Sequence, residues 1–396
     1  KELGVSAIIA TLLAQRGMHT FDAAKAFFRP QWEDLHSPFL MQDMDKAVDR
    51  IHAALEEDEA IMVYGDYDVD GTTSVALMAS FLAEKTTKIT PYIPDRYTEG
   101  YGVSYQGIDV AKAKGIQLII ALDCGVKAVD KVAYAKEKGI DFIICDHHLP
   151  GEELPQAVAL LDPKREDCNY PFDELCGCGI GFKLIQALSE RWQEPKENLY
   201  PYLDLVATAI AADIVPMEGE NRTLSFFGLA QLRQNSRPGI QGFLGALKKP
   251  VNITDLVFKV APRINAAGRM DHALVAVDLL RSKDPTEVKK IAEAIEQFNT
   301  ERRATDERIT KEALDQIKQK KEESFPATVV FAEDWHKGVV GIVASRLIEN
   351  YYRPTVVLTR SGENYAGSVR SIKGFNVYEA LEACKDHMIQ FGGHKY

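Results

Sequence analysis

The stretch VYGDYDVDG, from Val63 to Gly71, places aspartates at positions 66, 68 and 70 directly after a short apolar run. Side chains alternate along a strand, so Asp66 and Asp68 project to the same side if the strand continues through them. Both carboxylates can then reach adjacent cations. The stretch predicts a metal site at the end of a buried strand.

Two further apolar runs end in the same kind of residue. LIIAL runs into Asp123, and FIIC runs into Asp146, His147 and His148. Ligands bind at the carboxyl ends of the strands in an open parallel sheet, and mixed carboxylate and imidazole donors suit Mn²⁺ or Mg²⁺. An isolated aspartate at a strand end is more often a helix N-cap. Five candidates on three strand ends favour the metal site instead.

The chain divides by pattern into four parts. Residues 1–45 read as an N-terminal helical segment, and residues 46–283 as a domain in which helices alternate with the strands IMVYG, ITPYI, LIIAL, FIIC and AVALL. Such alternation is typical of a parallel sheet. Residues 284–322 are charged and helix-favouring, and residues 323–396 begin a second alternation. We expect an α/β fold in which a parallel-sheet domain is joined by a long helix to a smaller α/β domain.

Composition sets only loose bounds on function. The 396 residues allow two or three domains, and the chain lacks a run of about 18 apolar residues that would span a membrane. The net charge of −11 argues against nucleic acid at face value, but whole-chain charge says little about one groove. Six cysteines without a disulfide or zinc spacing predict a reducing cytoplasm. The start at Lys1 and the end just after a glycine pair lead us to expect a piece of a longer protein.

The motifs carry a family resemblance. VYGDYDVDGTTS, ALDCGV and CDHHLP resemble the three leading motifs of the DHH phosphoesterase superfamily. AADIVPM, APRINAAGRM, WHKGVVGIVASRL, GSVRS and FGGHK resemble the RecJ family within it, in the same order and over nearly the whole chain. The resemblance implies a DHH domain joined to a DHH-associated domain. It also implies a two-metal-dependent 5′-to-3′ exonuclease of single-stranded DNA that acts in DNA repair and recombination.

The resemblance implies a role for each residue of the metal site. Two ions, Mn²⁺ or Mg²⁺, would be held by Asp66, Asp68, Asp123, His147 and Asp213, with Asp123 bridging them as a catalytic residue. His148 would face the scissile phosphate as the second catalytic residue, and Asp70 and Asp146 would orient the ligands. Some relatives have a metal-binding histidine where Tyr64 stands, which leaves the occupancy of the first metal position open.

The resemblance also implies phosphate-binding residues in both domains. They are Arg96, Arg263, Asn265, Arg269, Ser368, Arg370 and His394. Arginine suits this task because its planar fork of donors matches phosphate oxygens. We expect Ser368 and Arg370 to lie in a turn and the segment around Arg263 to be a loop. Trp335 is either a stacking platform for bases or a core anchor.

The implied partners are single-stranded DNA with a 5′ end and a single-strand-binding protein or helicase, and we expect a monomer with no membrane contact. RecJ-like chains usually continue into an oligonucleotide-binding barrel after GGHK. Its absence here predicts weaker DNA binding.

Two alternatives stay open. One is a DHH phosphodiesterase acting on short oligonucleotides or cyclic dinucleotides, although such relatives usually lack the APRINAAGR segment. The other is a non-catalytic DNA-binding scaffold, against which the intact set of acidic and histidine residues argues. A plain nucleotide-binding protein is disfavoured because no glycine-rich phosphate loop follows the first strand.

Overall fold

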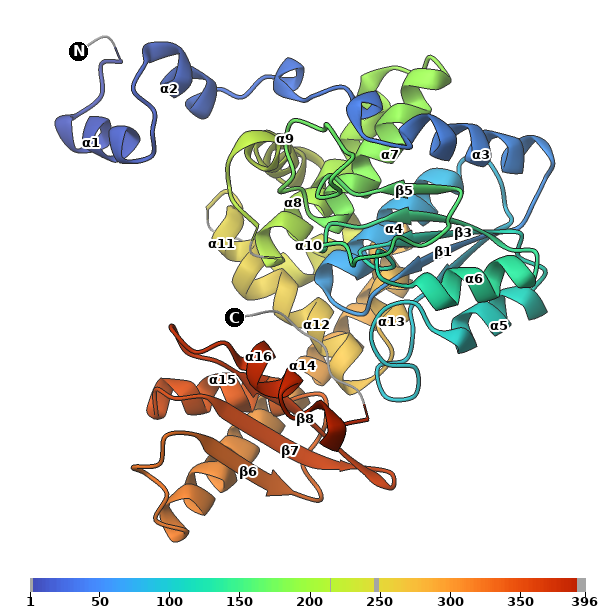
Figure 1. The fold of residues 1–396 in the computed structure, drawn as a ribbon. Coiled ribbons are helices and arrows are strands. Elements are labelled where there is room, and N and C mark those ends of the chain that lie inside the picture. The colour runs from blue at the N-terminus through green and yellow to red at the C-terminus, as the bar shows by residue number, and fades with distance from the viewer. Residues whose placement is uncertain (1–2, 214, 246–248, 390–396) are drawn as a thin grey trace. The chain divides into compact units, whose positions relative to one another are not determined.

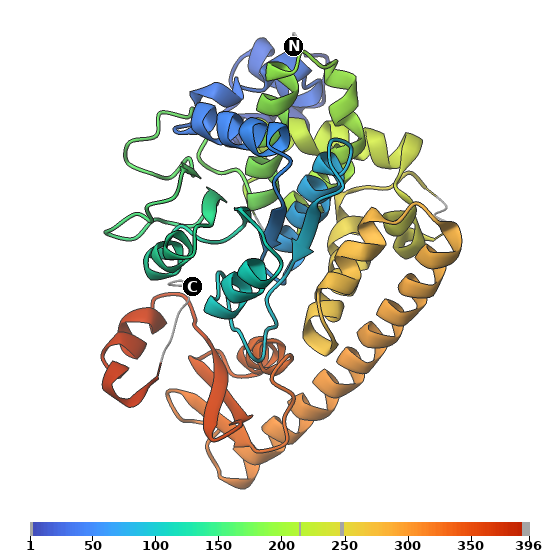
Figure 2. The same cartoon turned by 90° about the vertical axis from the view of Figure 1, so that its right-hand side faces the viewer.

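The computed structural model describes residues 3–213, 215–245 and 249–389. The chain forms two compact units, Lys1–Ile295 and Glu296–Tyr396. The long helix α14 (Pro285–Gln319) runs across the division between them, where the sequence predicts a linking helix. It is the extended orange helix in Figure 2.

The first unit is built on a five-stranded parallel sheet (Figure 1). Its strands are β1 (Ile61–Gly65), β2 (Ile89–Tyr92), β3 (Leu118–Leu122), β4 (Asp141–Cys145) and β5 (Ala159–Leu161). Their order is β2-β1-β3-β4-β5, and Gly65, Leu122 and Cys145 lie in register on neighbouring strands. The predicted parallel-sheet fold is confirmed. The register also means that the three acidic strand ends start at the same level of the sheet.

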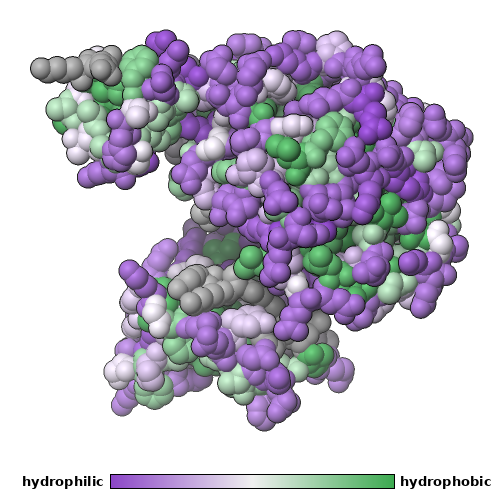
Figure 3. Space-filling view, turned by 45° about the horizontal axis from the view of Figure 1, so that its top comes forward, coloured by the Kyte–Doolittle hydropathy of each residue, from purple (hydrophilic) through white to green (hydrophobic). Residues whose placement is uncertain are grey.

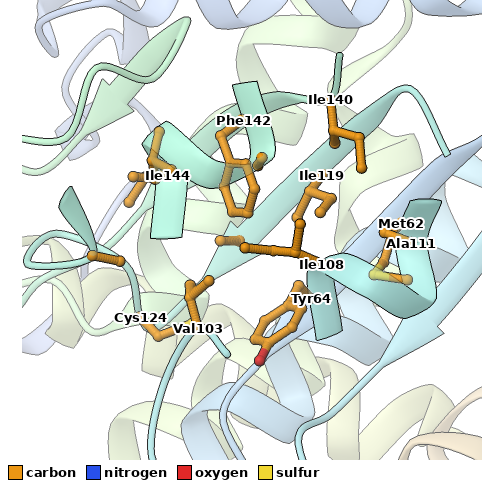
Figure 4. Packing of buried hydrophobic residues seen from close by; sticks show 14 of the residues in the cluster. Met62, Tyr64, Val103, Ile108, Ala111, Ile119, Cys124, Ile140, Phe142 and Ile144 are labelled. Atoms are coloured by element: carbon orange, nitrogen blue, oxygen red, sulfur yellow. The ribbon is translucent and has the colours of Figure 1, made fainter. Parts of the chain in front are cut away.

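Alternating apolar residues attach helices to both faces of this sheet. Met62, Tyr64, Ile119, Phe142 and Ile144 point to one face, where they form one buried cluster with α5 (Tyr105–Ala113) and α6 (Val129–Glu137) (Figure 4). The alternate residues face α4 (Val69–Leu82) and α7 (Gly177–Arg191). Burial on both faces explains why the strands read as nearly continuous apolar runs.

Helices complete the first unit around the sheet. Before the sheet lie α1 (Ala7–Gln15), α2 (Phe21–Phe28), η1 (Trp32–Asp34), η2 (Pro38–Leu40) and α3 (Met44–Glu56). After it lie η3 (Lys196–Tyr202), α8 (Leu203–Ala212), α9 (Gly219–Asn235), α10 (Pro238–Leu244), α11 (Ile253–Asp255), η4 (Leu256–Val260), α12 (Ala261–Met270) and α13 (Leu274–Arg281).

A buried ion pair fixes the start of α8. The side chain of Asp204 is 1% exposed and lies 2.7 Å from Nη2 of Arg237. Arg237 also donates to the carbonyl oxygens of Leu280 and Pro201 at 2.8 and 2.9 Å. Charge-assisted hydrogen bonds of this kind are about twice as strong as neutral ones. The first turn of α8 is therefore held firmly to the neighbouring helices.

A second buried ion pair ties the N-terminal segment to the helices beyond the sheet. Nζ of Lys183 lies 3.1 Å from Oε1 of Glu220 and donates to the carbonyl oxygen of His36 at 2.6 Å. Glu220 in turn accepts hydrogen bonds from the backbone N–H of His36 at 3.0 Å and the hydroxyl of Tyr170 at 2.6 Å. Both charged side chains are at most 1% exposed, so the pair is shielded from water.

The second unit has a three-stranded sheet of order β6-β7-β8. Strands β6 (Thr328–Ala332) and β7 (Thr355–Ser361) are parallel, and β8 (Asn364–Arg370) is antiparallel to β7. The unit also contains α15 (Val340–Asn350), α16 (Val377–Glu382) and η5 (Lys385–His387). The prediction of a turn around Ser368 and Arg370 is wrong. The segment pairs along its whole length with β7. Tyr365 and Val369 suit a strand, and Gly367 between them lets the two backbones approach closely.

Hydrophilic side chains dominate the face drawn in Figure 3. Among the described residues, every helix is either too short or too polar to cross a lipid bilayer.

Candidate metal centre and phosphate site

The aligned strand ends bring one histidine against three carboxylates. Nε2 of His147 lies 3.2 Å from Oδ1 of Asp123, 3.6 Å from Oδ2 of Asp213 and 3.8 Å from Oδ2 of Asp70. Asp213 reaches this point as the residue that ends α8. Two groups of potential ligands result, Asp123 with His147 and His148, and Asp70 with His147 and Asp213; within each group the donor atoms lie within 4.8 Å of one another.

Asp123 has an unusual backbone conformation. Its φ of 59° lies in the left-handed region, which is uncommon for residues other than glycine and is found most often where function requires it. Its N–H still donates to the carbonyl oxygen of Cys145 at 2.9 Å, so the β3–β4 ladder continues through it. The strained turn points a 2% exposed carboxylate into the cluster.

Asp66 and Asp68 differ in their surroundings. Asp66 is fully buried, and neither of its carboxylate oxygens has a hydrogen-bond partner among the described residues. Buried polar atoms are rarely left without partners, so a cation is the natural partner. Asp68 is half-buried and forms the N-cap of α4, where Oδ1 accepts from the backbone N–H of Gly71 at 3.0 Å. It therefore serves as a helix cap with its second oxygen still available.

Asp70 is held by backbone hydrogen bonds and also lies close to His147. Its two oxygens accept hydrogen bonds from the backbone N–H groups of Gly177 and Cys178, at 2.6 and 2.7 Å, at the first turn of α7. These bonds leave the carboxylate directed at His147. The structure therefore places Asp70 nearer to a direct ligand position than the sequence predicts.

The carboxylates of the cluster have raised pKa values. Burial and the charge of Asp68 raise the pKa of Asp66 to about 8 and that of Asp70 to about 7. Burial and the charges of Asp70 and Asp68 raise the pKa of Asp213 to about 8, and they raise that of Asp123 well above its usual value. So many carboxylates in one dry site repel one another. The donor set therefore fits divalent cations, which would relieve this repulsion.

His148 lies in a different setting from His147. Its Nδ1 is 2.7 Å from Oδ1 of Asp146, and its Nε2 is 3.2 Å from the hydroxyl of Tyr101. Burial opposes ionisation of both groups, yet their mutual hydrogen bond and charges lower the pKa of Asp146 and raise that of His148. Asp146 thus fixes the orientation of His148 in the way a carboxylate orients a catalytic histidine. No feature of the sequence singled out Tyr101.

Tyr64 has no ligand role in this arrangement. It belongs to the buried cluster of Figure 4, and its hydroxyl donates to the carbonyl oxygen of Gly102 at 2.9 Å. The Tyr64 side chain therefore holds the loop after β2.

Arg96 is the predicted phosphate-binding residue in that loop. Its guanidinium lies 3.8 Å from the ring centroid of Tyr67, the residue between Asp66 and Asp68. Burial raises the pKa of Asp66, and the charge of Arg96 partly opposes this rise. Nε of Arg96 is buried without a hydrogen-bond partner among the described residues. A cation beside the acidic cluster, with an unused donor, can bind a phosphate oxygen.

The segment around Arg263 is a helix, so the loop prediction is wrong. Arg263, Asn265 and Arg269 lie on α12, because alanines at positions 261, 266 and 267 favour a helix over a loop. Arg263 donates to the carbonyl oxygen of Lys259 at 2.7 Å, and the carbonyl oxygen of Arg269 accepts from the hydroxyl of Tyr97 at 2.5 Å. The three side chains are half-buried.

In the second unit, β8 brings Ser368 and Arg370 together. Nη1 of Arg370 donates to Oγ of Ser368 at 3.0 Å. Ser368 Oγ and Arg370 Nη2 would lie 3.1 and 3.3 Å from a Cβ atom at Gly341, in the first turn of α15. A helix N-terminus beside a serine and an arginine suits a phosphate. His394 lies outside the described residues, and Trp335 is a core anchor, 3% exposed, that donates to Glu312 at 2.8 Å.

Gly177 lets α7 approach the metal centre. A Cβ atom at this position would lie 2.6 Å from Cβ of Asp123 and 2.8 Å from its Cα. We expect Gly177→Ala to lower the free energy of unfolding by about 1–3 kcal/mol, as overpacking does. It should also weaken Mn²⁺ binding, because relief of the clash with Asp123 displaces the backbone N–H groups that orient Asp70. Denaturant unfolding and Mn²⁺ titration measure the two effects.

Gly179→Ala is the matched control on the same helix. Its nearest contact would be 3.3 Å to the end of the flexible Leu175 side chain. Equal effects from both substitutions would contradict the special role of Gly177.

Comparison with known proteins gives matches for both units. The family model described as "DHH family, N-terminal domain" matches residues 60–210, and the one described as "DHHA1 domain" matches residues 323–396. The single-stranded-DNA-specific exonuclease RecJ of Bacillus subtilis is 41% identical over 100% of this chain and 50% of its own length. The RecJ of Escherichia coli is 34% identical over 98% of this chain and 70% of its own.

Solved structures match as well. A crystal structure of exonuclease RecJ bound to manganese is 31% identical, with a TM-score of 0.78, over 90% of this chain and 89% of that one. RecJ of Thermus thermophilus in complex with Mn²⁺ is 29% identical, with a TM-score of 0.86, over 99% of this chain and 56% of that one. The chain thus spans about half the length of some of the relatives it matches.

Proposed function

The chain belongs to the RecJ family of DHH proteins, and from this premise we propose that it is a divalent-metal-dependent exonuclease that shortens single-stranded DNA from its 5′ end. The observation that carries the proposal is the cluster of buried carboxylates around His147 at the aligned strand ends. Two of the matching relatives are named single-stranded-DNA-specific exonuclease RecJ, and a matching RecJ structure is bound to manganese.

The cluster would hold two cations, Mn²⁺ or Mg²⁺. The ligands we propose are Asp66, Asp68, Asp123, His147 and Asp213, and Asp70 orients them and lies close enough to contribute an oxygen. When bound, the ions supply Lewis acidity that activates a water molecule and offsets the negative charge at phosphorus. The unpartnered oxygens of Asp66 and the raised carboxylate pKa values support this assignment.

His148 is the proton donor to the leaving oxygen. Asp146 accepts from Nδ1 of His148 and keeps the ring charged more readily than a free imidazole. The proton at Nε2 is then the one that is transferred. Arg96 would neutralise a phosphate oxygen beside the acidic cluster.

The second unit would bind the 5′-terminal phosphate of the strand. Arg370 offers charged donors, Ser368 offers a hydroxyl, and the first turn of α15 offers backbone N–H groups around Gly341. The side chains on α12, Arg263, Asn265 and Arg269, would contact further phosphates.

The proposed substrate suggests a compartment, a pathway and partner proteins. We propose that the protein works as a monomer in the cytoplasm, in DNA repair and recombination, on strands supplied by a helicase or covered by a single-strand-binding protein. All six cysteines are free, as expected in a reducing compartment.

Digestion of labelled DNA tests the proposal. A single strand carrying a 5′-phosphate should be shortened from its 5′ end in the presence of Mn²⁺, whereas the matching duplex should be spared. Turnover of only a dinucleotide or a cyclic dinucleotide would move the function to a small-substrate phosphodiesterase. Binding of the strand without any turnover would favour the scaffold.

Arg370→Met tests the 5′-phosphate site. We expect KM for a 5′-phosphorylated strand to rise about 10-fold, because a charge-assisted hydrogen bond contributes roughly 1.5–3 kcal/mol, while KM for a 5′-hydroxyl strand changes little. Arg360→Met on the neighbouring strand β7 is the control, since Arg360 is exposed and its ion pair is 3.8 Å long. An equal rise in KM for both kinds of strand end would rule out a 5′-phosphate site at Arg370.

A further inference from the structure

Both ring nitrogens of His148 have partners in the protein. Asp146 lies at Nδ1 and the hydroxyl of Tyr101 lies at Nε2, at 2.7 and 3.2 Å. Both oxygens of Asp146 accept hydrogen bonds from backbone N–H groups, those of Val126, His147 and His148. The carboxylate is therefore an acceptor, and Nδ1 of His148 is the donor to it. While the ring is neutral, Nε2 carries a lone pair to which a phenol can donate; once the ring is charged, Nε2–H donates to the phenol oxygen instead.

His148 is within reach of the candidate metal centre. One nitrogen of His148 lies within 4.8 Å of ligand atoms of Asp123 and His147, close enough for the three to hold a cation. Adjacent histidines at such a site compete for the same role, because a neutral imidazole is a good ligand for Mn²⁺ and similar ions. If only His147 is to bind the metal, another group must therefore occupy the free nitrogen of His148.

Tyr101 lies in a loop that is fixed with the phenol hydroxyl beside Nε2 of His148. Glu99 accepts hydrogen bonds from the hydroxyl of Ser104 at 2.5 Å, from the hydroxyl of Tyr92 at the end of β2 at 2.9 Å and from the backbone N–H of Asp95 at 2.8 Å. On the other side of Tyr101, the hydroxyl of Tyr64 donates to the carbonyl oxygen of Gly102 at 2.9 Å. The loop is thus fixed on both sides of a residue that is itself 58% exposed.

We propose that Tyr101 occupies Nε2 of His148 and so reserves this histidine for the substrate, leaving His147 as the histidine that binds metal. Tyr64, through Gly102, sets the position of Tyr101. The phenol is exposed, so an arriving leaving oxygen can replace it at Nε2. The separate roles of His147 as metal ligand and His148 as substrate contact rest on the proposed function. The hydrogen bond between Tyr101 and His148 does not depend on it.

Tyr101→Phe tests the proposal with two independent readouts. Without the hydroxyl, His148 can join the cations, so we expect Mn²⁺ to bind about 10-fold more tightly, in line with the effect of ligand-orienting groups on metal affinity. We expect kcat to fall about 10-fold with KM unchanged within about twofold, as when a group that acts only in the transition state is lost. Isothermal titration with Mn²⁺ and single-strand digestion measure them.

Two further variants serve as a weaker perturbation and as a control. Tyr64→Phe should shift both quantities in the same direction by a smaller factor. Tyr105→Phe is the control, because Tyr105 is exposed at the start of α5 and its hydroxyl has no hydrogen-bond partner in the described part of the chain. The ¹⁵N shift of Nε2 of His148 in metal-free protein should change in Tyr101→Phe and not in Tyr105→Phe.

The outcomes separate this inference from the function. Tighter Mn²⁺ binding and a changed Nε2 shift in a protein that cleaves no DNA would uphold the role of Tyr101 and overturn the exonuclease. Unchanged Mn²⁺ affinity and unchanged kcat would overturn the role of Tyr101. A rise in KM alone would also overturn it, because Tyr101 would then be a DNA contact.

Discussion

Asp123→Asn should reduce single-strand digestion about 10³-fold or more while leaving the metal-free protein folded. Metal ions contribute several kcal/mol to stabilisation of the transition state, and each 1.4 kcal/mol is about tenfold in rate. The amide keeps the size of the side chain but lacks the charge. Because burial and the neighbouring charges of Asp70 and Asp68 raise the pKa of Asp123, removing the charge should not destabilise the metal-free protein.

Thermal unfolding with and without Mn²⁺ separates these effects. Mn²⁺ at about 100 times its Kd should stabilise the parent protein by about 2.7 kcal/mol, and Asp123→Asn should lose most of this increment. Asp130→Asn, an exposed position in the first turn of α6, should behave like the parent. If Asp123→Asn kept both its digestion rate and its stabilisation by Mn²⁺, the proposed metal centre would be wrong.

Glu220→Gln should lower the free energy of unfolding by about 3–5 kcal/mol, because it leaves the ammonium of Lys183 buried without a counter-charge. Lys183 has an exposed side-chain fraction of 0%, so water cannot replace the lost partner. Urea unfolding of the parent and the variant at neutral pH measures the loss.

The pH dependence gives a second test of this buried pair. Burial already lowers the pKa of Lys183, and the charge of Glu220 opposes the shift; without Glu220 the pKa should fall further. The unfolded state then binds more protons than the folded state, so stability rises with pH. The deficit of Glu220→Gln should therefore shrink between neutral pH and about pH 10, the usual range of lysine.

The double variant Lys183→Met with Glu220→Gln completes the cycle. It removes both charges and should recover much of the lost stability, since a buried ion pair can often be replaced by apolar groups at little cost. A deficit of Glu220→Gln that is independent of pH, with no recovery in the double variant, would show that the loss comes from packing instead.

The sequence was sufficient for the sheet and for the edge at which the acidic residues meet. The strands are short, apolar and separated by helices, and Asp66, Asp123 and Asp146 each follow the last residue of a strand. Parallel pairing in register then brings them to one level. Local pattern and tertiary structure agree in this part of the chain.

Sequence reasoning failed where contacts between distant segments decide the structure. Ser368 and Arg370 lie on a strand because β7 is there to pair with them, and their small neighbours suggested a turn. The role of Tyr64 could not be predicted, because its partner Gly102 lies 38 residues away in the chain. Tyr101 has no motif of its own, and only its contact with His148 reveals it.

Helix α8 connects two of the features described above. Asp204 at its first turn is clamped by Arg237, and Asp213 ends it at the metal centre. The helix between them is about 13 Å long at roughly 1.5 Å per residue. To adapt the site to a larger or smaller ion, every ligand could be left intact and the Asp204–Arg237 ion pair changed instead, which would shift the carboxylate of Asp213 along the helix axis.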